Sequence, residues 1–180
     1  MSPPPPPPPP DGTAAAAVDL ETLFADAPAG HKRELRLWLR LLACANLIEG
    51  EVRRRLRLSF GTTLPRFDLL AQLDRAGGGG LTLGEASRRM MVTNGNVTGI
   101  AARLVAEGLV ARRADPADRR AGTLRLTPRG RREFARQSAA HEAWIAELLA
   151  GLAPAEQSAL HRLLGRAKEG ARAAMGEASE

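Results

Sequence analysis

The sequence contains few of the residues from which metal sites and disulfide frameworks are built. It has one cysteine and three histidines among 180 residues, and it has no tyrosine. Cys44 alone cannot form a disulfide within the chain or a site with several thiolate ligands. His31, His141 and His161 are too scattered in the sequence to show a metal-binding spacing. We expect no metal ion and no other cofactor.

Long apolar runs and catalytic motifs are also missing. No segment approaches the roughly 20 apolar residues that a membrane-spanning helix needs, and the N-terminus lacks the pattern of a secretion signal. Gly77–Gly80 are not followed by the Lys-Ser/Thr pair of a phosphate-binding loop. No nucleophile with its base and no suggestive pair of carboxylates is visible. A soluble cytoplasmic protein without enzymatic activity is the expectation.

Proline, by contrast, is concentrated near the N-terminus, where Pro3–Pro10 form an unbroken run. Such a run favours an extended polyproline II conformation, and the Ala-rich segment after it has few large apolar side chains. Residues 1–28 are therefore predicted to be a disordered tail. We interpret this tail as a spacer rather than as a ligand for an aromatic groove. Residues 29–180 are predicted to form one folded domain.

The positive charge of the chain is concentrated in its middle. The net charge is +6, and residues 82–132 alone contain eleven arginines against four acidic residues. Residues 1–31, in contrast, carry four acidic residues and no lysine or arginine. A basic block of this kind suits a polyanionic partner. Because a charged run is often only a solvated surface, the motifs inside the block must decide.

The spacing of apolar residues predicts helices on both sides of this basic block. Residues 32–58 carry a stripe of apolar side chains so broad that it needs two partners, one in its own domain and one outside it. Thr82 and Glu85 form the Thr-x-x-Glu pattern of a capping box, and Thr93 and Thr127 stand at further helix starts. Further helices are expected over residues 65–75, 83–91, 94–107, 128–149 and 154–174.

Two short runs, residues 109–111 and 123–126, predict a β-hairpin with the polar segment 115–120 at its tip. The expected fold class is therefore mainly α with a small β-wing. A winged helix-turn-helix over about residues 62–128 lies between N-terminal and C-terminal dimerisation helices, at about 31–58 and 128–175.

The helix over 94–107 has an unusual solvent face. Its apolar residues fall on one side, while Gly95, Gly99 and Ala102 fall on the other. Each exposed glycine costs about 1 kcal/mol of helix stability relative to alanine. Small residues are useful where the backbone must approach another surface closely, as in a DNA major groove. A close helix–helix contact is the alternative explanation.

The polar residues beside these glycines are of the types that contact DNA. Asn96 and Arg103 can form bidentate bonds with adenine and guanine, and Thr98 can contact bases or a thymine methyl group. Thr93 and Asn94 stand at the helix start, where free N–H groups suit phosphate. We therefore expect this helix to contact double-stranded DNA.

The hairpin adds further arginines. Arg112, Arg113, Arg119 and Arg120 flank or occupy its tip, and a narrow minor groove attracts arginine. Asp118 is interpreted as a structural partner of a neighbouring arginine, because a free carboxylate there would oppose DNA binding. The alternative is an exposed loop with incidental ion pairs.

These segments together resemble the MarR family of transcription regulators. VTNGNVTG at residues 92–99 and EGLV at 107–110 resemble its recognition helix and the start of its wing, and DPADRR at 115–120 resembles its wing signature. The resemblance implies a homodimer whose first and last helices interlock, and it implies that Arg120 reaches into the minor groove. Ala153 departs from the pattern, because relatives often have a Ser or Thr cap there.

LPRFDLLAQL at 64–73 and HEAW at 141–144 are similar to a subgroup that controls catabolism of aromatic acids. The subgroup implies an effector that is a small aromatic acid or its acyl-CoA thioester. The candidate effector pocket consists of Trp38, Arg40, Asn46, Arg66 and Phe67. Plain core packing is the competing explanation for the two aromatic residues.

The resulting hypothesis is a ligand-responsive DNA-binding transcriptional regulator. It would be a repressor that binds a pseudo-palindromic operator as a homodimer and is released by its effector. One alternative is a winged-helix module that binds protein, although the exposed helix face lacks the apolar anchors of a protein interface. The other is a thiol-based redox sensor using Cys44, which stands in mid-helix, where a thiol is commonly an inert apolar residue.

Overall fold

The computed structural model describes residues 33–113 and 122–176. The chain divides into two compact units, residues 1–51 and 52–180, which are described separately. Helix α1, Arg33–Phe60, begins in the first unit and ends in the second. The predicted tail, residues 1–28, and the tip of the predicted wing lie outside the described residues.

The described part of the first unit is the N-terminal portion of α1. Leu39 is buried, whereas Leu37, Trp38 and Leu47 are 60%, 57% and 72% exposed. The broad apolar stripe expected for this helix is therefore present, and much of its surface is left uncovered. Apolar surface of this extent is typical of a helix that needs a second partner.

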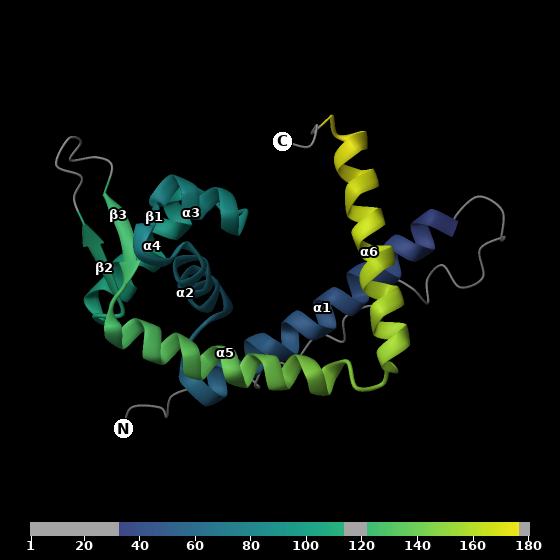
Figure 1. The fold of residues 1–180 in the computed structure, drawn as a ribbon, viewed down its shortest axis with the longest axis horizontal. Helices are drawn as coiled ribbons and strands as arrows, with labels where there is room; N and C mark the ends of the chain where they lie inside the picture. Colours follow the sequence, from purple (N-terminus) through teal and green to yellow (C-terminus); the bar gives the residue numbers. More distant parts are fainter. Residues whose placement is uncertain (1–32, 114–121, 177–180) are drawn as a thin grey trace, which may run out of the picture. The chain divides into compact units, whose positions relative to one another are not determined.

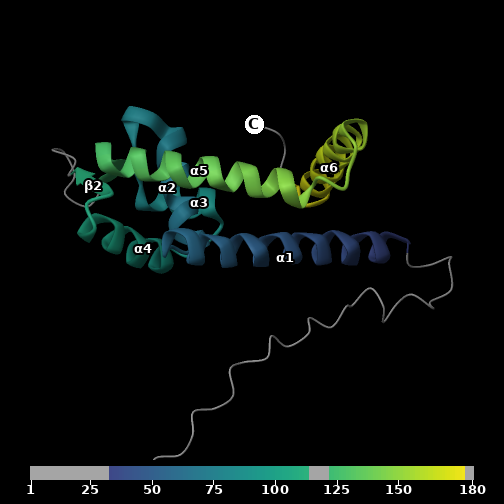
Figure 2. The same ribbon diagram turned by 90° about the horizontal axis from the view of Figure 1, so that it is seen from below.

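The second unit contains the winged helix-turn-helix (Figures 1 and 2). Its described elements after α1 confirm the fold class expected from the sequence. In chain order they are α2 (Leu64–Ala76), the short 3-10 helix η2 (Gly77–Gly79), β1 (Leu81–Thr82), α3 (Leu83–Met90), α4 (Asn94–Ala106), β2 (Val110–Arg113), β3 (Thr123–Leu126), α5 (Pro128–Leu148) and α6 (Pro154–Ala174).

A single apolar core holds α2, α3, α4 and the strands together. Leu69, Leu70 and Leu73 of α2 meet Leu104 of α4 and Leu124 of β3 in this core, and all five are almost completely buried. The helical residues recur at the three- and four-residue spacing that places side chains on one face of a helix. Burial of this face therefore fixes which side of α4 is turned to solvent.

The sheet has three strands in the order β1-β3-β2, whereas the sequence predicted only a two-stranded hairpin. Val110 pairs with Leu126 in the expected antiparallel hairpin, and Leu81 pairs with Leu124 on the other side of β3. A two-residue strand is too short to show an alternating pattern, which explains why β1 was missed. Gly80 precedes it with a φ of 72°, a conformation that favours glycine.

Helix α5 begins against Leu109, the residue that immediately precedes β2. Thr127 donates its backbone N–H to the Leu109 carbonyl at 3.0 Å, and its hydroxyl accepts the N–H of Gly130 at 2.9 Å. A Cβ atom on Gly130 would lie 1.9 Å from the Leu109 carbonyl oxygen. Only glycine fits this contact, so the start of α5 is fixed by one close approach of two backbones.

Helix α5 then runs beside the end of α1, within the second unit. Arg55 of α1 forms a two-pronged ion pair with Glu147, with nitrogen–oxygen distances of 2.6 and 2.9 Å. The rings of Phe60 and Trp144 are 6.1 Å apart. After α5 the chain turns into α6, none of whose residues is buried. This last helix therefore adds little to the core of its own unit.

Replacing Gly130 with alanine is expected to destabilise the protein by about 1–3 kcal/mol, because the added methyl group overlaps the Leu109 carbonyl. Gly99→Ala is the matched control, since Gly99 also lies in a helix but an added Cβ there meets nothing within 4 Å. The control should be more stable than the parent by up to about 1 kcal/mol. Urea unfolding measures both, and a neutral Gly130→Ala would contradict the close-approach argument.

Candidate nucleic-acid interface

Helix α3 begins with the capping box expected from the sequence. Thr82 donates its backbone N–H to the Glu85 carboxylate at 2.8 Å, and Glu85 donates its own N–H to the Thr82 hydroxyl at 3.2 Å. Two hydrogen bonds to the Glu85 carboxylate hold its pKa below the ordinary value of 4.5. The larger effect comes from the backbone N–H of Thr82, and the smaller comes from the Thr82 hydroxyl. The cap thus orders the start of the helix-turn-helix.

The turn between α3 and α4 is closed by a buried serine that sequence reasoning missed. The Ser87 hydroxyl donates to the Val92 carbonyl, and the Val92 N–H donates to the Ser87 carbonyl at 3.2 Å. Met91 between them has a φ of 53°, in the left-handed region that non-glycine residues rarely adopt. Its side chain is 92% exposed. The turn therefore depends on hydrogen bonds rather than on a glycine.

Helix α4 presents the predicted small and polar face to solvent. Val97, Ala101 and Leu104 are buried, and they turn the opposite side outward. A Cβ on Gly95 or Gly99 would meet nothing within 4 Å. Among the described residues, no helix packs on this face. The structure therefore gives no support to the alternative explanation, in which the glycines permit a close helix–helix contact. The remaining exposed residues of α4 toward this face are Asn94, Asn96, Thr98, Ala102 and Arg103.

The start of α4 is less fully capped than the starts of α3 and α5. Thr93 occupies the N-cap position as expected, but its side chain makes no capping hydrogen bond. The Thr98 hydroxyl donates to the Asn94 carbonyl at 2.8 Å. The first N–H groups of the helix thus lack a side-chain acceptor from Thr93, which leaves the positive end of the helix dipole available to an anion.

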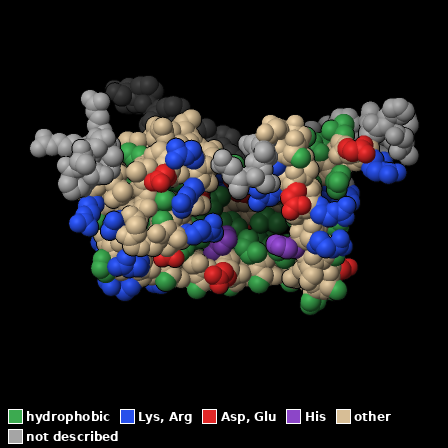
Figure 3. All heavy atoms as spheres, turned by 45° about the horizontal axis from the view of Figure 1, so that its top comes forward, with side chains coloured by type: hydrophobic (Ala, Val, Ile, Leu, Met, Phe, Trp, Pro, Cys, Tyr) green, Lys and Arg blue, Asp and Glu red, His purple; other side chains and the backbone are tan. Residues whose placement is uncertain are grey.

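Arginines lie on the elements on either side of α4. Arg112 and Arg113 of β2 are exposed, as the hairpin prediction requires. Arg88 and Arg89 in the last turn of α3 are also exposed, and sequence reasoning did not single them out. Basic side chains are visible over the face of this unit in Figure 3. Asp118, Arg119 and Arg120 lie outside the described residues.

The candidate effector residues do not form one described site. Trp38, Arg40 and Asn46 belong to the first unit, whereas Arg66 and Phe67 belong to the second. Phe67 is buried, and its ring packs 5.6 Å from that of Phe134 and 5.0 Å from that of His141.

Phe67 is therefore a core residue of the second unit. Burial lowers the pKa of His141, its ring neighbour. Arg66 is held in an ion pair with Glu107. Cys44, expected to be an inert apolar residue, is exposed on α1.

Other classes of site are not seen in the described ranges. No group of three or more potential metal ligands occurs among residues 33–113 and 122–176. Within the same ranges, no helix is both long enough and apolar enough to cross a membrane. Among residues 33–113 and 122–176, the exposed face of α4 with its flanking arginines is the candidate surface for binding a nucleic acid.

Comparison with known proteins relates this geometry to one family. Residues 60–121 match the sequence model of the MarR family. A relative named transcriptional activatory protein BadR, from Rhodopseudomonas palustris, is 34% identical over 109 residues, which are 59% of this chain. The chain spans 62% of the length of that relative.

Solved structures give the same relationship. A MarR family transcriptional regulator from Silicibacter pomeroyi is 31% identical, with a TM-score of 0.66 over 79% of this chain and 98% of that one. Sco3205, a MarR family transcriptional regulator from Streptomyces coelicolor solved in complex with DNA, is 24% identical. Its TM-score is 0.66 over 74% of this chain and 84% of that one. At this level of identity, the likeness shows that the two proteins share a fold and nothing more.

The Glu85 cap predicts an acid-sensitive contribution to stability. Because the pKa of Glu85 is lowered in the folded protein, its contribution is present above the ordinary pKa of 4.5 and is lost as pH falls through the folded value. Glu85→Gln should therefore be less stable than the parent at neutral pH, with a difference that shrinks in acid. Urea unfolding across this pH range measures it. A difference that is independent of pH would argue against an ionised cap.

Proposed function

This chain belongs to the MarR family of transcriptional regulators, and on that premise we propose that it binds double-stranded DNA as a homodimer and regulates transcription. The family is one of regulators and not of enzymes. The observation that carries the proposal is the exposed face of α4, where two glycines with open space around them lie between Asn96, Thr98 and Arg103. A regulator of this kind acts on DNA, so we assign it to the cytoplasm.

The proposed partner of this face is the major groove. A groove of B-DNA about 12 Å wide admits an α-helix, and small residues let the helix backbone approach the base edges. Asn96 and Arg103 are assigned to base edges, with Thr98 beside them. Thr93 and Asn94 are assigned to phosphate, because the positive end of the α4 dipole is turned to solvent there. Sco3205, whose fold is similar, was solved in complex with DNA, which supports double-stranded DNA as the partner.

The proposed role of the hairpin is to contact the minor groove beside the site of α4. Arg113 lies at the end of β2 on the exposed side, two residues before the tip segment begins with Asp115. Arg119 and Arg120 follow in that segment, and Asp118 is assigned to hold an arginine in position. Minor-groove arginines favour a narrow groove with an enhanced negative potential. This contact would add affinity with little base readout.

Removing a base contact should weaken binding at the operator more than on random DNA. Asn96→Ala and Arg103→Ala are each expected to lose about 1–3 kcal/mol at the specific site. Gly99→Ala should be more stable than the parent yet bind the operator about tenfold more weakly, a loss of about 1.4 kcal/mol, because its methyl group faces the groove. Fluorescence anisotropy with DNA from upstream of the protein's own gene gives these affinities.

Arg172→Ala is the matched control, since it removes the same charge from an exposed position on α6. It should change neither affinity nor discrimination. Equal losses on operator and random DNA would mean that Asn96 and Arg103 contact only the backbone. Failure of the parent protein to bind any such fragment would reject the DNA-binding proposal.

The proposed homodimer rests on apolar surface that the chain does not cover. Leu160, Leu163 and Leu164 of α6 are 39%, 51% and 41% exposed. Leu160 and Leu164 border a cleft of about 530 Å³ with Leu149 and Leu152. With the exposed residues of α1, this is more apolar surface than a monomer usually leaves in contact with water. A two-fold dimer would bury it and present two α4 helices about one DNA turn apart.

Charge on this face should abolish dimerisation and operator binding together. Leu163→Glu is expected to give monomers or aggregates in sedimentation, because a carboxylate cannot be buried there without a partner. Arg162→Glu places a carboxylate on the opposite side of α6, by the helical spacing, and should leave the dimer intact. A Leu163→Glu monomer that still binds the operator would remove dimerisation from the proposal.

The proposed effector is a small aromatic acid or its acyl-CoA thioester, which would release a repressor from DNA by favouring a conformation that fits the operator less well. The assignment is supported by the subgroup resemblance of residues 64–73 and 141–144. Activation is the second candidate, because the relative from Rhodopseudomonas palustris is named an activatory protein. Transcription from the operator in vitro, with and without the protein, separates the two.

A further inference from the structure

Met91, in the turn between α3 and α4, combines two features that are unfavourable in the chain by itself. Among residues 33–113 and 122–176, it is the only residue other than glycine with a positive φ, at 53°. Its side chain is 92% exposed, more than that of any other large apolar residue in these ranges. Glycine would adopt this conformation without steric cost, and a polar side chain would not place apolar surface in water. The sequence therefore has methionine at a position where folding favours a different residue.

The residues on either side show what the fold requires of this turn. Met90 is buried in the core, and Val92 packs against the same core, whereas Met91 does not belong to it. The N–H of Met91 donates to the Arg88 carbonyl at 3.3 Å, and the bonds between Ser87 and Val92 close the turn. The fold thus uses the backbone of Met91 and makes no use of its side chain.

An exposed methionine in a left-handed conformation has the properties of a contact residue. Residues held in rarely populated backbone conformations cluster at binding sites. The left-handed residue at the end of a helix is usually glycine, so the side chain is what this position gains by the departure. A methionine side chain is unbranched and polarisable, and it adapts to irregular apolar surfaces. Its partner is therefore sought outside the chain.

The charges around Met91 select the class of partner. Residues 86–106 contain three arginines and no acidic residue. Arg88 and Arg89 are exposed in the preceding turn of α3, and neither forms an ion pair within the part of the chain that the structure describes. Both help to lower the pKa of Glu85, but that carboxylate is occupied by the hydrogen bonds of the cap. A partner with negative charge and an apolar group fits this surface.

Double-stranded DNA offers both. Its phosphates carry the charge, and the C5 methyl group of thymine is the apolar group that the base edges present in the major groove. Helix α4 begins at Asn94, three residues after Met91. In helix-turn-helix proteins, the start of the recognition helix contacts base edges, while the preceding helix crosses the DNA backbone. The turn between the two helices therefore lies where a base edge and the backbone are both within reach.

We propose that Met91 contacts the C5 methyl group of a thymine in each half-site and thereby helps to determine which sequence is bound. Arg88 and Arg89 contact the phosphates beside that thymine. The inference rests on the proposed DNA-binding function, to which it adds a base-reading residue outside α4. The contact removes the exposed side chain from water, which explains why methionine is present at a position that suits glycine.

Replacing thymine with uracil removes only the methyl group and tests the contact directly. DNA from upstream of the protein's own gene is prepared with thymidine or with deoxyuridine, and fluorescence anisotropy gives both affinities. Met91→Asn is the test variant, because asparagine tolerates the left-handed conformation and has no apolar end. Uracil should weaken the parent more than Met91→Asn, by about fourfold for each half-site. This factor corresponds to about 0.8 kcal/mol, the usual value for burying a group of this size.

Three further variants separate this contact from an effect on folding. Met91→Leu keeps an apolar side chain and should keep the preference for thymine. Met91→Gly should lose the preference yet unfold at a higher urea concentration than the parent, because glycine relieves the left-handed backbone. The matched control is Met175→Asn, which removes another exposed methionine, at the end of α6, and should behave like the parent.

Single replacements of thymidine with deoxyuridine locate the contact along the fragment. One symmetry-related pair of positions should lose its effect in Met91→Asn, while thymines read from α4 keep theirs. A uracil effect of equal size in the parent and in Met91→Asn would overturn the proposal. If Met91→Asn then binds both DNAs as tightly as the parent, the side chain serves a protein partner instead; if it binds both more weakly, it contacts sugar or phosphate. In either case the DNA-binding function stands, whereas a parent that binds neither DNA would refute that function as well.

Discussion

The carbonyl group of Leu109 is the point where helix α4, the hairpin and helix α5 meet. It accepts the backbone N–H of Thr127, and it lies so close to Gly130 that no side chain fits there. The N–H of Leu109 donates to the Leu104 carbonyl at 3.0 Å, which ties the same residue to the end of α4. These backbone contacts therefore connect the end of α4 directly to the start of α5.

The contacts beside this junction are of a weaker kind. The ion pair of Arg66 and Glu107 is partly exposed, with side chains 20% and 43% accessible. Exposed pairs contribute about 0–1 kcal/mol, far less than the buried leucines of the core contribute together. The ion pair of Arg66 and Glu107 therefore adds little to the attachment of α4, which depends mainly on the buried leucines.

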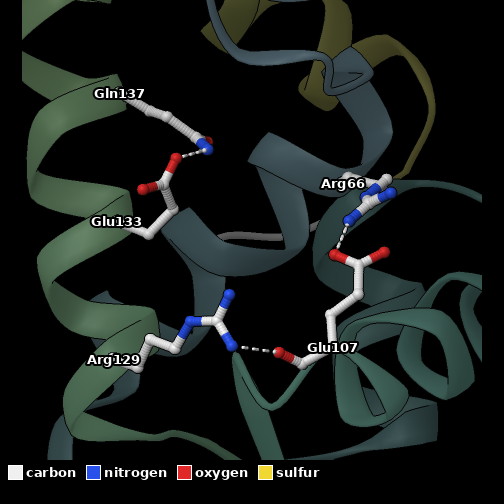
Figure 4. Close-up of polar contacts among 5 residues, drawn as sticks. All are labelled: Arg66, Glu107, Arg129, Glu133 and Gln137. Carbon is white, nitrogen blue, oxygen red and sulfur yellow. Dashed lines mark hydrogen bonds and ion pairs between the residues drawn. The ribbon is translucent and has the colours of Figure 1, made fainter.

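Sequence patterns predicted the features that depend on residues close together in the chain. The cap of α3 follows from Thr82 and Glu85 at a spacing of three, and the open face of α4 follows from two glycines on one side of the helix. Features made by distant residues were missed. Glu107 and Arg66 are 41 positions apart, and Glu107 and Arg129 are 22 apart. No periodicity relates them, so these polar contacts (Figure 4) could be found only in three dimensions.

Phe67 is a residue for which the sequence pattern suggested a role that the structure does not support. Its sequence neighbourhood suggested a ligand pocket, but its ring packs against two residues of α5. Core packing therefore explains its apolar side chain without a ligand. Ser87 is the converse case, because a serine inside a helix gave no indication that its hydroxyl would close the next turn. In both cases the partner lies on another element or across a turn, and the residue type alone did not identify it.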